Sequence, residues 1–206
     1  AGDPARQPPH VLFVGRLIEK KGPMDALEAF AQARLLVPER LRAEMRLRVV
    51  GDGPLQQAMQ RRMNELGLEG CVDVLGVQPP KAVAEWMRKS RCLFLPSRTA
   101  SDGDAEGCPV VVLEAQLSGL PVVSTRHAGI PEVVLDGTTG LLVEEGDVAG
   151  LAQALALMCR DPQRAKQLGS AGRARVMSHF TVDHHVKTVA DVLSGVVSRQ
   201  QQPADR

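Results

Sequence analysis

Two basic side chains lie in a short segment that has a glycine at each end. The segment reads GRLIEKKG, from Gly15 to Gly22, and carries Arg16 and Lys21 directly after the apolar run His10–Val14. A planar guanidinium offers paired N–H donors and an ammonium offers a compact positive charge, so together they suit a phosphate or diphosphate. A solvated basic loop is the alternative interpretation of this segment taken alone.

Two glutamates, Glu106 and Glu114, are separated by seven residues around the start of an expected helix. The first N–H groups of a helix have no intrahelical partner, so they form a site for an anion. Between the two carboxylates, Gly107, Cys108, Val110 and Val111 can supply free amides at the helix start, whereas Pro109 has no N–H. A carboxylate on a sheet-packed helix needs a partner, and sugar hydroxyls are suitable donors. The alternative is that Glu114 faces solvent, where the helix dipole favours it.

Three other polar motifs carry weaker signals. GDGP, at residues 51–54, lacks the third glycine of a dinucleotide fingerprint because position 56 is Gln56, so we interpret it as a tight turn approaching a ligand or a neighbouring loop. Asp102 and Asp104 resemble a pair that holds a divalent cation, but no further ligand is nearby in the sequence, and a polar turn is the preferred interpretation. His127 could bond a ligand, but a lone loop histidine more commonly has a structural role. We assign no chemistry to the other histidines.

The composition excludes several classes of function. The 206 residues include 25 Lys plus Arg and 24 Asp plus Glu, and the net charge of +1 gives no field for holding nucleic acid or an anionic membrane. Aromatic residues make up 2%, too few for the stacking platforms of a single-strand binder. Hydrophobic residues make up 44%, which is enough to bury a core. These values favour an α/β domain with a small-molecule site.

The cysteine pattern indicates a reducing compartment. The cysteines are Cys71, Cys92, Cys108 and Cys159, with no C-x-x-C pair and no zinc-ligand spacing. All except Cys108 lie in apolar contexts, where we expect buried, reduced thiols. No apolar run approaches the roughly 18 residues of a membrane span, and the N-terminus has no apolar core of a secretion signal. We therefore expect a cytoplasmic protein with at most peripheral membrane association.

Apolar runs of strand length alternate with helical patterns along the chain. The expected strands are His10–Val14, Leu47–Val50, Val72–Leu75, Cys92–Leu95, Pro121–Ser124 and Gly140–Val143. The expected helices are Pro23–Val37, Pro54–Leu66, Pro80–Lys89, Pro109–Leu117, Ile130–Leu135 and most of residues 148–197, with breaks near Pro162 and Phe180. Continuous apolar strands joined by helices are typical of a parallel sheet covered on both faces. This predicts an α/β fold, a Rossmann-like doubly wound parallel sheet of about six strands with extra C-terminal helices.

The expected domain covers residues 10–199, between a flexible N-terminal tail over residues 1–9 and a C-terminal tail over residues 200–206. In a doubly wound sheet, ligands bind at the carboxyl ends of the strands. Arg16 and Lys21 follow the first strand, and Glu106 and Glu114 follow the fourth. The sequence therefore predicts one pocket in which basic side chains face an amide-rich helix start.

Four segments in this order resemble one enzyme family. They are GRLIEKKG after the first strand, GDGP after the second, EGCPVVVLE after the fourth and STRHAGIPE after the fifth. Together they resemble the carboxyl-terminal, donor-binding domain of retaining glycosyltransferases of family 4 (glycosyl transferase group 1), which have the two-domain GT-B architecture. The segment SDGDAEGCPVVVLEAQLSGLPVVSTRHAGIPEVV is especially similar to bacterial transferases of the exopolysaccharide and colanic-acid type. The resemblance runs from about residue 10 to residue 180 and implies one half of a GT-B fold.

The resemblance implies a role for each candidate residue. Arg16 and Lys21, in the loop that begins at Gly15, would bind the diphosphate of a nucleoside-diphosphate sugar. Glu106 would contact the transferred sugar, as a nucleophile or as a positioning group, and Glu114 would hold the ribose hydroxyls. The implied backbone contacts are Gly107 and Cys108 with the sugar, Val110 and Val111 with the phosphates, and residues 71–76 with the nucleobase. The catalytic set is then Glu106, Arg16 and Lys21, with no metal and no cofactor.

The resemblance also implies partners that this sequence does not contain. GT-B enzymes have an N-terminal, acceptor-binding domain, so we expect a hexosyltransferase-type enzyme whose isolated donor half is inactive and whose acceptor is a glycan or a lipid-linked molecule. The complete enzyme would act at the inner face of the cell membrane. The last helix would reach back to the missing domain, leaving uncovered an apolar stripe of Val182, Val186, Val189, Leu193 and Val196.

Two other functions stay open at this point. A sugar-nucleotide epimerase of the same architecture is disfavoured by the order of the basic and acidic motifs. A non-catalytic nucleotide-binding module, of the flavodoxin or receiver type, is the other. A receiver needs a phospho-accepting Asp at a strand end, whereas the residues at or just after the strand ends here are Gly15, Gly51, Gly76, Pro96 and Thr125. The sequence does not specify the donor sugar, its base, the acceptor or the oligomeric state.

Overall fold

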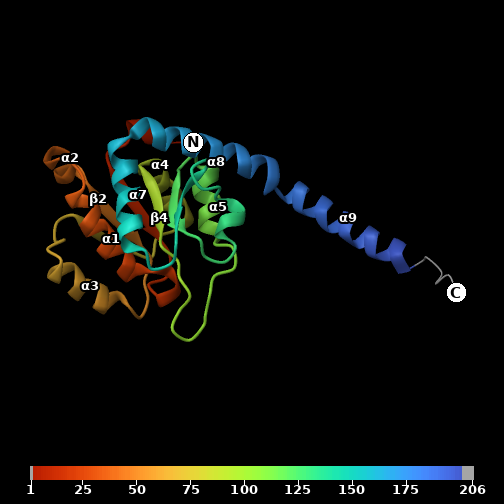
Figure 1. Cartoon of the computed structure of the whole chain (residues 1–206), viewed down its shortest axis with the longest axis horizontal. Helices are drawn as coiled ribbons and strands as arrows, with labels where there is room; N and C mark the ends of the chain where they lie inside the picture. The colour runs from red at the N-terminus through yellow and green to blue at the C-terminus, as the bar shows by residue number, and fades with distance from the viewer. Residues whose placement is uncertain (1, 201–206) are drawn as a thin grey trace.

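A single parallel sheet organises the molecule (Figure 1). The computed structural model describes residues 2–200, with side chains described through residue 194. The strands are β1 (His10–Val14), β2 (Arg46–Val50), β3 (Val72–Gly76), β4 (Cys92–Leu95), β5 (Val122–Thr125) and β6 (Gly140–Val143). All neighbouring strands pair in parallel. The predicted strands are confirmed, with no boundary displaced by more than one residue.

The strand order is β3-β2-β1-β4-β5-β6, so the direction of winding reverses between β1 and β4. The chain builds outward from β1 to β3, returns to place β4 beside β1, and then builds outward to β6. This is the predicted doubly wound, Rossmann-like arrangement. Ligands in such sheets bind beyond the carboxyl ends of the strands at the reversal. The loops that follow β1 and β4 therefore meet at the expected binding edge.

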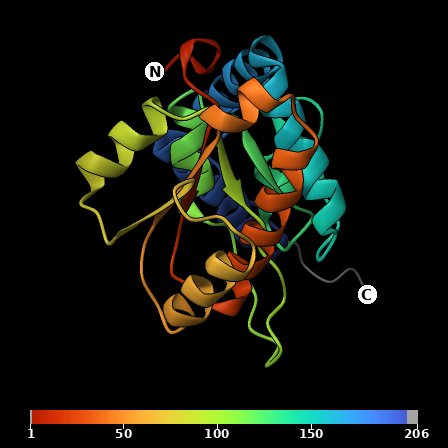
Figure 2. The ribbon, with the colours of Figure 1, turned by 90° about the vertical axis from the view of Figure 1, so that its left-hand side faces the viewer.

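Helices cover both faces of the sheet (Figure 2). On one face, α1 (Pro23–Leu35) packs against α3 (Gln56–Glu65) and α7 (Val148–Arg160). The other face is covered by α4 (Pro80–Arg88) and α5 (Val110–Leu117), and α8 (Pro162–His179) packs against α5. The remaining helices are η1 (Pro4–Arg6), η2 (Glu19–Lys21), α2 (Glu39–Glu44), α6 (Ile130–Val133) and α9 (Val182–Gln200). The predicted helices are confirmed, whereas η1, η2 and α2 were not predicted. Helix α1 stops before Pro38 because proline disfavours helical geometry in the residue before it.

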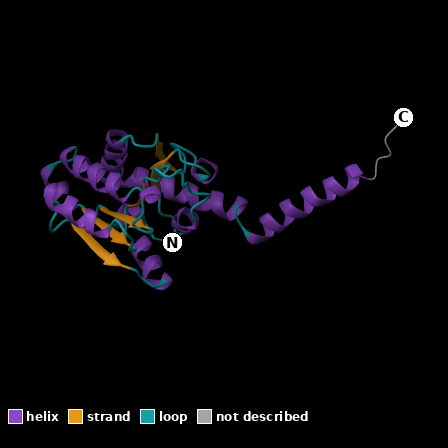
Figure 3. Ribbon diagram, turned by 90° about the horizontal axis from the view of Figure 1, so that it is seen from below, coloured by secondary structure: helices purple, strands orange, loops and turns teal. Residues whose placement is uncertain are grey.

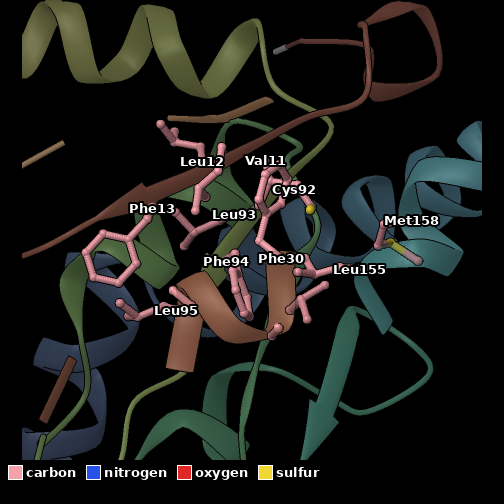
Figure 4. Packing of buried hydrophobic residues seen from close by; sticks show 14 of the residues in the cluster. Val11, Leu12, Phe13, Phe30, Cys92, Leu93, Phe94, Leu95, Leu155 and Met158 are labelled. Carbon is pink, nitrogen blue, oxygen red and sulfur yellow. The ribbon is translucent and has the colours of Figure 1, made fainter. Parts of the chain in front are cut away.

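The hydrophobic core gives the strand ends a rigid base (Figure 4). Phe13 and Phe94 from β1 and β4, Phe30 from α1, and Leu155 and Met158 from α7 are all fully buried. Burying one such side chain stabilises the fold by about 1.5–3 kcal/mol. Because the central strands are buried on both faces, every residue of β4 is apolar and inaccessible to water.

The N-terminal residues lie against the body of the domain, which differs from the expected flexible tail. Asp3 caps η1 and pairs with Lys166 at 3.1 Å, and Pro4 is buried next to α8. The Gly2 N–H donates to the Ser118 carbonyl at 3.1 Å. The buried Arg91 guanidinium donates to the Gln7 carbonyl. A buried guanidinium requires hydrogen-bond acceptors, and the N-terminal segment supplies one of them for Arg91. The polar sequence of this segment gave no indication of that contact.

Helix α9 leaves the body of the domain and projects into solvent (Figures 1 and 3). Its apolar residues Val182, Val186, Val189 and Leu193 are exposed, as expected for an uncovered stripe. The side chain of Val196 and the predicted tail beyond residue 200 lie outside the described residues. None of the described helices combines the length and apolar character that a membrane crossing requires.

Two glycines allow the loops at the binding edge to touch. A Cβ on Gly22, which has φ +63°, would lie 2.0 Å from the Pro96 carbonyl oxygen, so the loop after β1 contacts the loop after β4 through backbone. A Cβ on Gly51, with φ +131°, would lie 2.0 Å from the Gly15 carbonyl oxygen. The GDGP segment is therefore a turn that packs on a neighbouring loop, one of the two interpretations given above.

We predict that Gly22→Ala lowers the free energy of unfolding by about 2–4 kcal/mol, because it adds a steric overlap to the strain of a positive φ. The matched control is Gly67→Ala. Gly67 has φ +62° with no atom within 4 Å of the place where a Cβ would lie, so this change should cost only about 1 kcal/mol. Urea denaturation of both variants measures the difference. Equal losses would show that the Gly22–Pro96 approach is not a tight contact.

Candidate functional site

The loops after β1 and β4 form one wall of the candidate site. The Arg98 N–H donates to the Lys20 carbonyl at 3.0 Å, and the Ser101 hydroxyl donates to Glu19 at 2.7 Å. Lys20 Nζ lies 3.0 Å from Asp104 Oδ1, and this contact raises the pKa of Lys20. The two loops are therefore joined along their length by backbone and side-chain bonds.

Lys21 and Glu106 are in direct contact. Lys21 Nζ lies 2.9 Å from Glu106 Oε1, with the lysine side chain 15% and the glutamate side chain 9% exposed. The lysine stem crosses over Gly15, where a Cβ would meet its Cδ at 3.4 Å. Glu106 Oε1 receives no hydrogen bond of good geometry from any described residue, although the ammonium is near. The pair therefore neutralises the two charges in a position that is largely removed from water.

Arg16 lies on the same loop but, within residues 2–200, forms no ion pair with either glutamate. Its side chain is exposed. The loop that carries it is fixed by the GDGP turn, because the Leu17 N–H donates to the Asp52 carbonyl at 2.7 Å and the Gly15 N–H donates to the Val50 carbonyl at 3.0 Å. The guanidinium is thus exposed on a fixed backbone at this edge of the sheet.

Helix α5 begins at this edge without a side-chain cap. Pro109 occupies the N-cap position, and the N–H groups of Val110 and Val111 have no intrahelical acceptor because they are in the first turn. The carbonyl of Gly107 accepts from the Gly129 N–H at 3.0 Å, and Gly107 and Cys108 are exposed. The helix start therefore presents the amides that the sequence predicted.

Glu114 lies on a separate, apolar part of the site. It lines a cavity of about 370 Å³ together with Val14, Gln78, Pro80, Val83, Ala84, Met87, Val111, Leu117 and Ser118. Neither Lys21 nor Glu106 lines this cavity, so the single pocket predicted from the sequence is divided into an apolar and a charged part. None of residues 71–76, the expected base region, lines this cavity; Cys71 is buried before the amino end of β3, and Gln78 is the first cavity-lining residue after that strand.

Asp102 and Asp104 make contacts within and beside their own loop. Asp102 Oδ1 accepts from the Asp104 N–H at 2.9 Å, as in the predicted polar turn, and Asp104 pairs with Lys20. Within residues 2–200, no group of three or more His, Cys, Asp or Glu side chains is placed to hold a metal ion.

Two residues at this edge were not predicted to contribute. His127 is 1% exposed, and its Nε2 accepts the Glu106 N–H at 3.0 Å while its Nδ1 lies 2.5 Å from Glu145 Oε1. Glu145 also accepts the Thr99 N–H at 2.8 Å. The position of His127 after the fifth strand was a signal for the same edge of the sheet. Glu145 carried no signal, because nothing local to an exposed turn indicates its long-range partners.

The sequence matches the family described as Glycosyl transferases group 1 over residues 3–175. It is 35% identical over 191 residues to the amylovoran biosynthesis glycosyltransferase AmsK of Erwinia amylovora, a match that covers 93% of this chain and 46% of AmsK. It is 34% identical over 193 residues to the putative colanic acid biosynthesis glycosyltransferase WcaL of Salmonella typhimurium, covering 92% of this chain and 46% of WcaL. The chain therefore spans about half the length of these curated relatives.

The fold is also similar to a structure solved with ligands. HepE of Anabaena, crystallised in complex with UDP and glucose, superposes with a TM-score of 0.77 at 26% sequence identity. The match covers 92% of this chain and 49% of the HepE chain.

We predict that Lys21 and Glu106 stabilise each other by about 1–2 kcal/mol, because each shields the other's charge in a largely dry position. A double-mutant cycle with Lys21→Met and Glu106→Gln, measured by urea denaturation, gives this coupling. The control cycle uses the neighbouring pair with Lys20→Met and Asp104→Asn, whose Asp104 is 53% exposed, and should give a smaller coupling. Equal couplings in the two cycles would contradict the shielding of the Lys21–Glu106 pair.

Proposed function

The chain belongs to the glycosyl transferases group 1 family, and from this premise we propose that it is the donor-binding half of a retaining glycosyltransferase. The complete enzyme transfers a hexose from a nucleoside-diphosphate sugar to a glycan or lipid-linked acceptor in bacterial exopolysaccharide biosynthesis. It works in the cytoplasm, at the inner face of the membrane, without a metal or another cofactor. Amylovoran and colanic acid transferases among its relatives support this choice of product.

The observation that carries the proposal is the Lys21–Glu106 contact beside an uncapped helix start. An ammonium has three N–H donors, so Lys21 can bind a phosphate oxygen while it faces Glu106. Arg16 approaches the same diphosphate from the exposed side of its loop. The amides of Val110 and Val111 provide the remaining donors at the positive end of α5.

The apolar cavity accounts for the other end of the donor. Its volume of about 370 Å³ is within the range of small-molecule sites, and Val83 and Met87 give it walls suited to the face of a base. Glu114 borders the cavity and is exposed, so its carboxylate can accept hydrogen bonds from two ribose hydroxyls. A nucleoside diphosphate sugar then extends from the cavity toward Glu106, with its diphosphate over the start of α5.

The proposed chemistry follows the charge that develops on the donor. The bond between the anomeric carbon and the phosphate oxygen breaks, and its electron pair passes to the nucleoside diphosphate. The acceptor hydroxyl oxygen forms the new bond to the anomeric carbon, and its proton passes to the leaving diphosphate. Arg16, Lys21 and the α5 amides stabilise this leaving group where the charge appears, and they are already in place before reaction. Glu106 is next to the carbon that becomes positive, either as a nucleophile or as a group that positions the sugar, and Gly107 and Cys108 meet the sugar through their backbone.

We predict that the chain binds UDP or GDP weakly and shows no turnover of a sugar nucleotide, because the acceptor-binding half is a separate part of the enzyme. Arg16→Ala and Glu114→Ala should each lower nucleotide affinity about tenfold or more, since each removes hydrogen bonds to a charged group. Calorimetric titration measures the affinity, and thermal-shift measurements with different nucleoside diphosphates show which base is preferred. The matched controls are Arg160→Ala and Glu69→Ala, two exposed residues of the same types outside the site.

Indifference to every nucleoside diphosphate would reject the donor-binding proposal in favour of a non-catalytic module. Equal losses in the site and control variants would place the nucleotide elsewhere. Turnover by the chain alone would contradict the need for a second half.

We further predict that a bound nucleoside-diphosphate sugar slows the modification of Cys108 by a thiol reagent. Cys108 is exposed at the sugar end, whereas Cys71, Cys92 and Cys159 are buried as predicted, and burial raises the pKa of Cys159 to about 12. In the native protein one thiol per chain should therefore react, releasing one equivalent of chromophore from the reagent. The rate of this reaction should rise with pH because the thiolate is the reacting form. The nucleoside diphosphate without sugar should protect less. Equal rates with and without donor would place the sugar away from Cys108.

A further inference from the structure

His127 is a buried histidine with a hydrogen-bond partner at each ring nitrogen. It follows β5 and is 1% exposed. Its Nε2 lies 3.0 Å from the Glu106 nitrogen, and its Nδ1 lies 2.5 Å from Glu145 Oε1. The three residues come from the loops after β4, β5 and β6, which are neighbouring strands of the sheet. They therefore form a chain of contacts across three adjacent strand ends.

These partners determine which ring nitrogen carries the proton. The Glu106 main-chain N–H is a donor, so Nε2 must accept and must be unprotonated. The ring proton is then on Nδ1 and faces the Glu145 carboxylate. Burial acts to raise the pKa of Glu145, but the hydrogen bonds from the Thr99 amide and His127, together with the electrostatic attraction of the His127 ring, outweigh it and lower this pKa. Arg126, the neighbouring cation, pairs with Glu144 and Asp136 and not with Glu145.

The same contacts hold the loop between β4 and α5, residues 96–109 and called here the acidic loop, at two places. Glu145 accepts the Thr99 N–H near the start of the loop, and His127 accepts the Glu106 N–H near its end. The Gly129 N–H binds the Gly107 carbonyl at 3.0 Å, so the backbone is held on both sides of the Glu106 side chain. Residues 101–105, between the two attachments, are exposed. Rotation of the Glu106 backbone is therefore restrained by His127, whereas the loop tip is held by other contacts, those of Ser101 with Glu19 and of Asp104 with Lys20.

We propose that His127, oriented by Glu145, is a positioning residue that sets the Glu106 carboxylate for the sugar of the donor. The inference rests on the proposed function for the identity of the ligand, but its geometric part concerns the chain alone. A buried imidazole costs free energy unless both nitrogens are satisfied, and here both are, so the ring specifies one orientation. A small displacement of a group near the reacting atoms strongly reduces its contribution to the reaction rate. Such a group therefore needs neighbouring hydrogen bonds that hold it in position.

The first test uses the chain without any nucleotide. Heteronuclear NMR of a nitrogen-labelled sample should show His127 neutral, with a protonated Nδ1 and an unprotonated Nε2, which have well-separated nitrogen shifts. The Glu106 amide should exchange with solvent about tenfold faster in His127→Phe, which has no acceptor. His127→Gln should restore slow exchange, because its amide oxygen reaches the position of Nε2. A proton on Nε2, or unchanged exchange in His127→Phe, would overturn the proposal.

The second test separates sugar recognition from nucleotide recognition. His127→Phe and Glu145→Gln should weaken binding of a nucleoside-diphosphate sugar about three- to tenfold, and binding of the nucleoside diphosphate by less than about twofold. Glu145→Gln has one acceptor oxygen for two N–H donors. Its matched control is Glu144→Gln, whose side chain is 77% exposed and pairs with Arg126, and which should change neither affinity.

The outcomes distinguish the two proposals. If neither ligand binds the unmodified chain, the proposed function fails, while the NMR and exchange results still decide whether His127 holds Glu106. If both ligands bind and both lose affinity equally in His127→Phe, the ring supports the fold and does not position Glu106. A selective loss with the sugar nucleotide, restored in His127→Gln, supports the proposal.

Discussion

The contact between Lys21 and Glu106 joins the two loops on which the site depends. Each charge is largely removed from water, so each is stable in its position only because the other is present. The two residues meet because β1 and β4 are adjacent, and these strands are adjacent because the winding of the sheet reverses between them. The ion pair is therefore a product of topology, and it lies at the place where this topology leaves the strand ends accessible.

The site is chemically divided in a way that matches an elongated ligand of changing polarity. One part is an apolar cavity bordered by Glu114, and the other contains Lys21, Glu106 and the first amides of α5. Helix α5 contributes to both parts, since Val111 lines the cavity and belongs to the uncapped first turn of the helix. The proposed ligand, a nucleoside diphosphate sugar, has the same order, from the flat ring faces of a base through charged phosphates to a hydroxyl-rich ring.

Support for the acidic loop comes from strands farther along the sheet. The Glu145–His127 contacts fasten this loop at Thr99 and Glu106, and Lys20 fastens it from the opposite side through Asp104. The hydrophobic core beneath these strands keeps their ends in register, so the attachments remain in place relative to one another. By contrast, the described side chains of α9 expose its apolar residues to solvent and take no part in supporting this loop.

The sequence by itself determined the strands, the longer helices and the candidates on the loops after β1 and β4, because burial on both faces imposes continuous apolar runs and ligands bind at strand ends. From that alternation Arg16, Lys21 and Glu106 could be assigned to one edge. Only the tertiary structure decided that Glu114 borders a separate cavity, that Pro4 packs beside α8, and that His127 and Glu145 hold Glu106. Local periodicity reports how a residue faces its own element, whereas these contacts depend on which distant loops the sheet brings side by side.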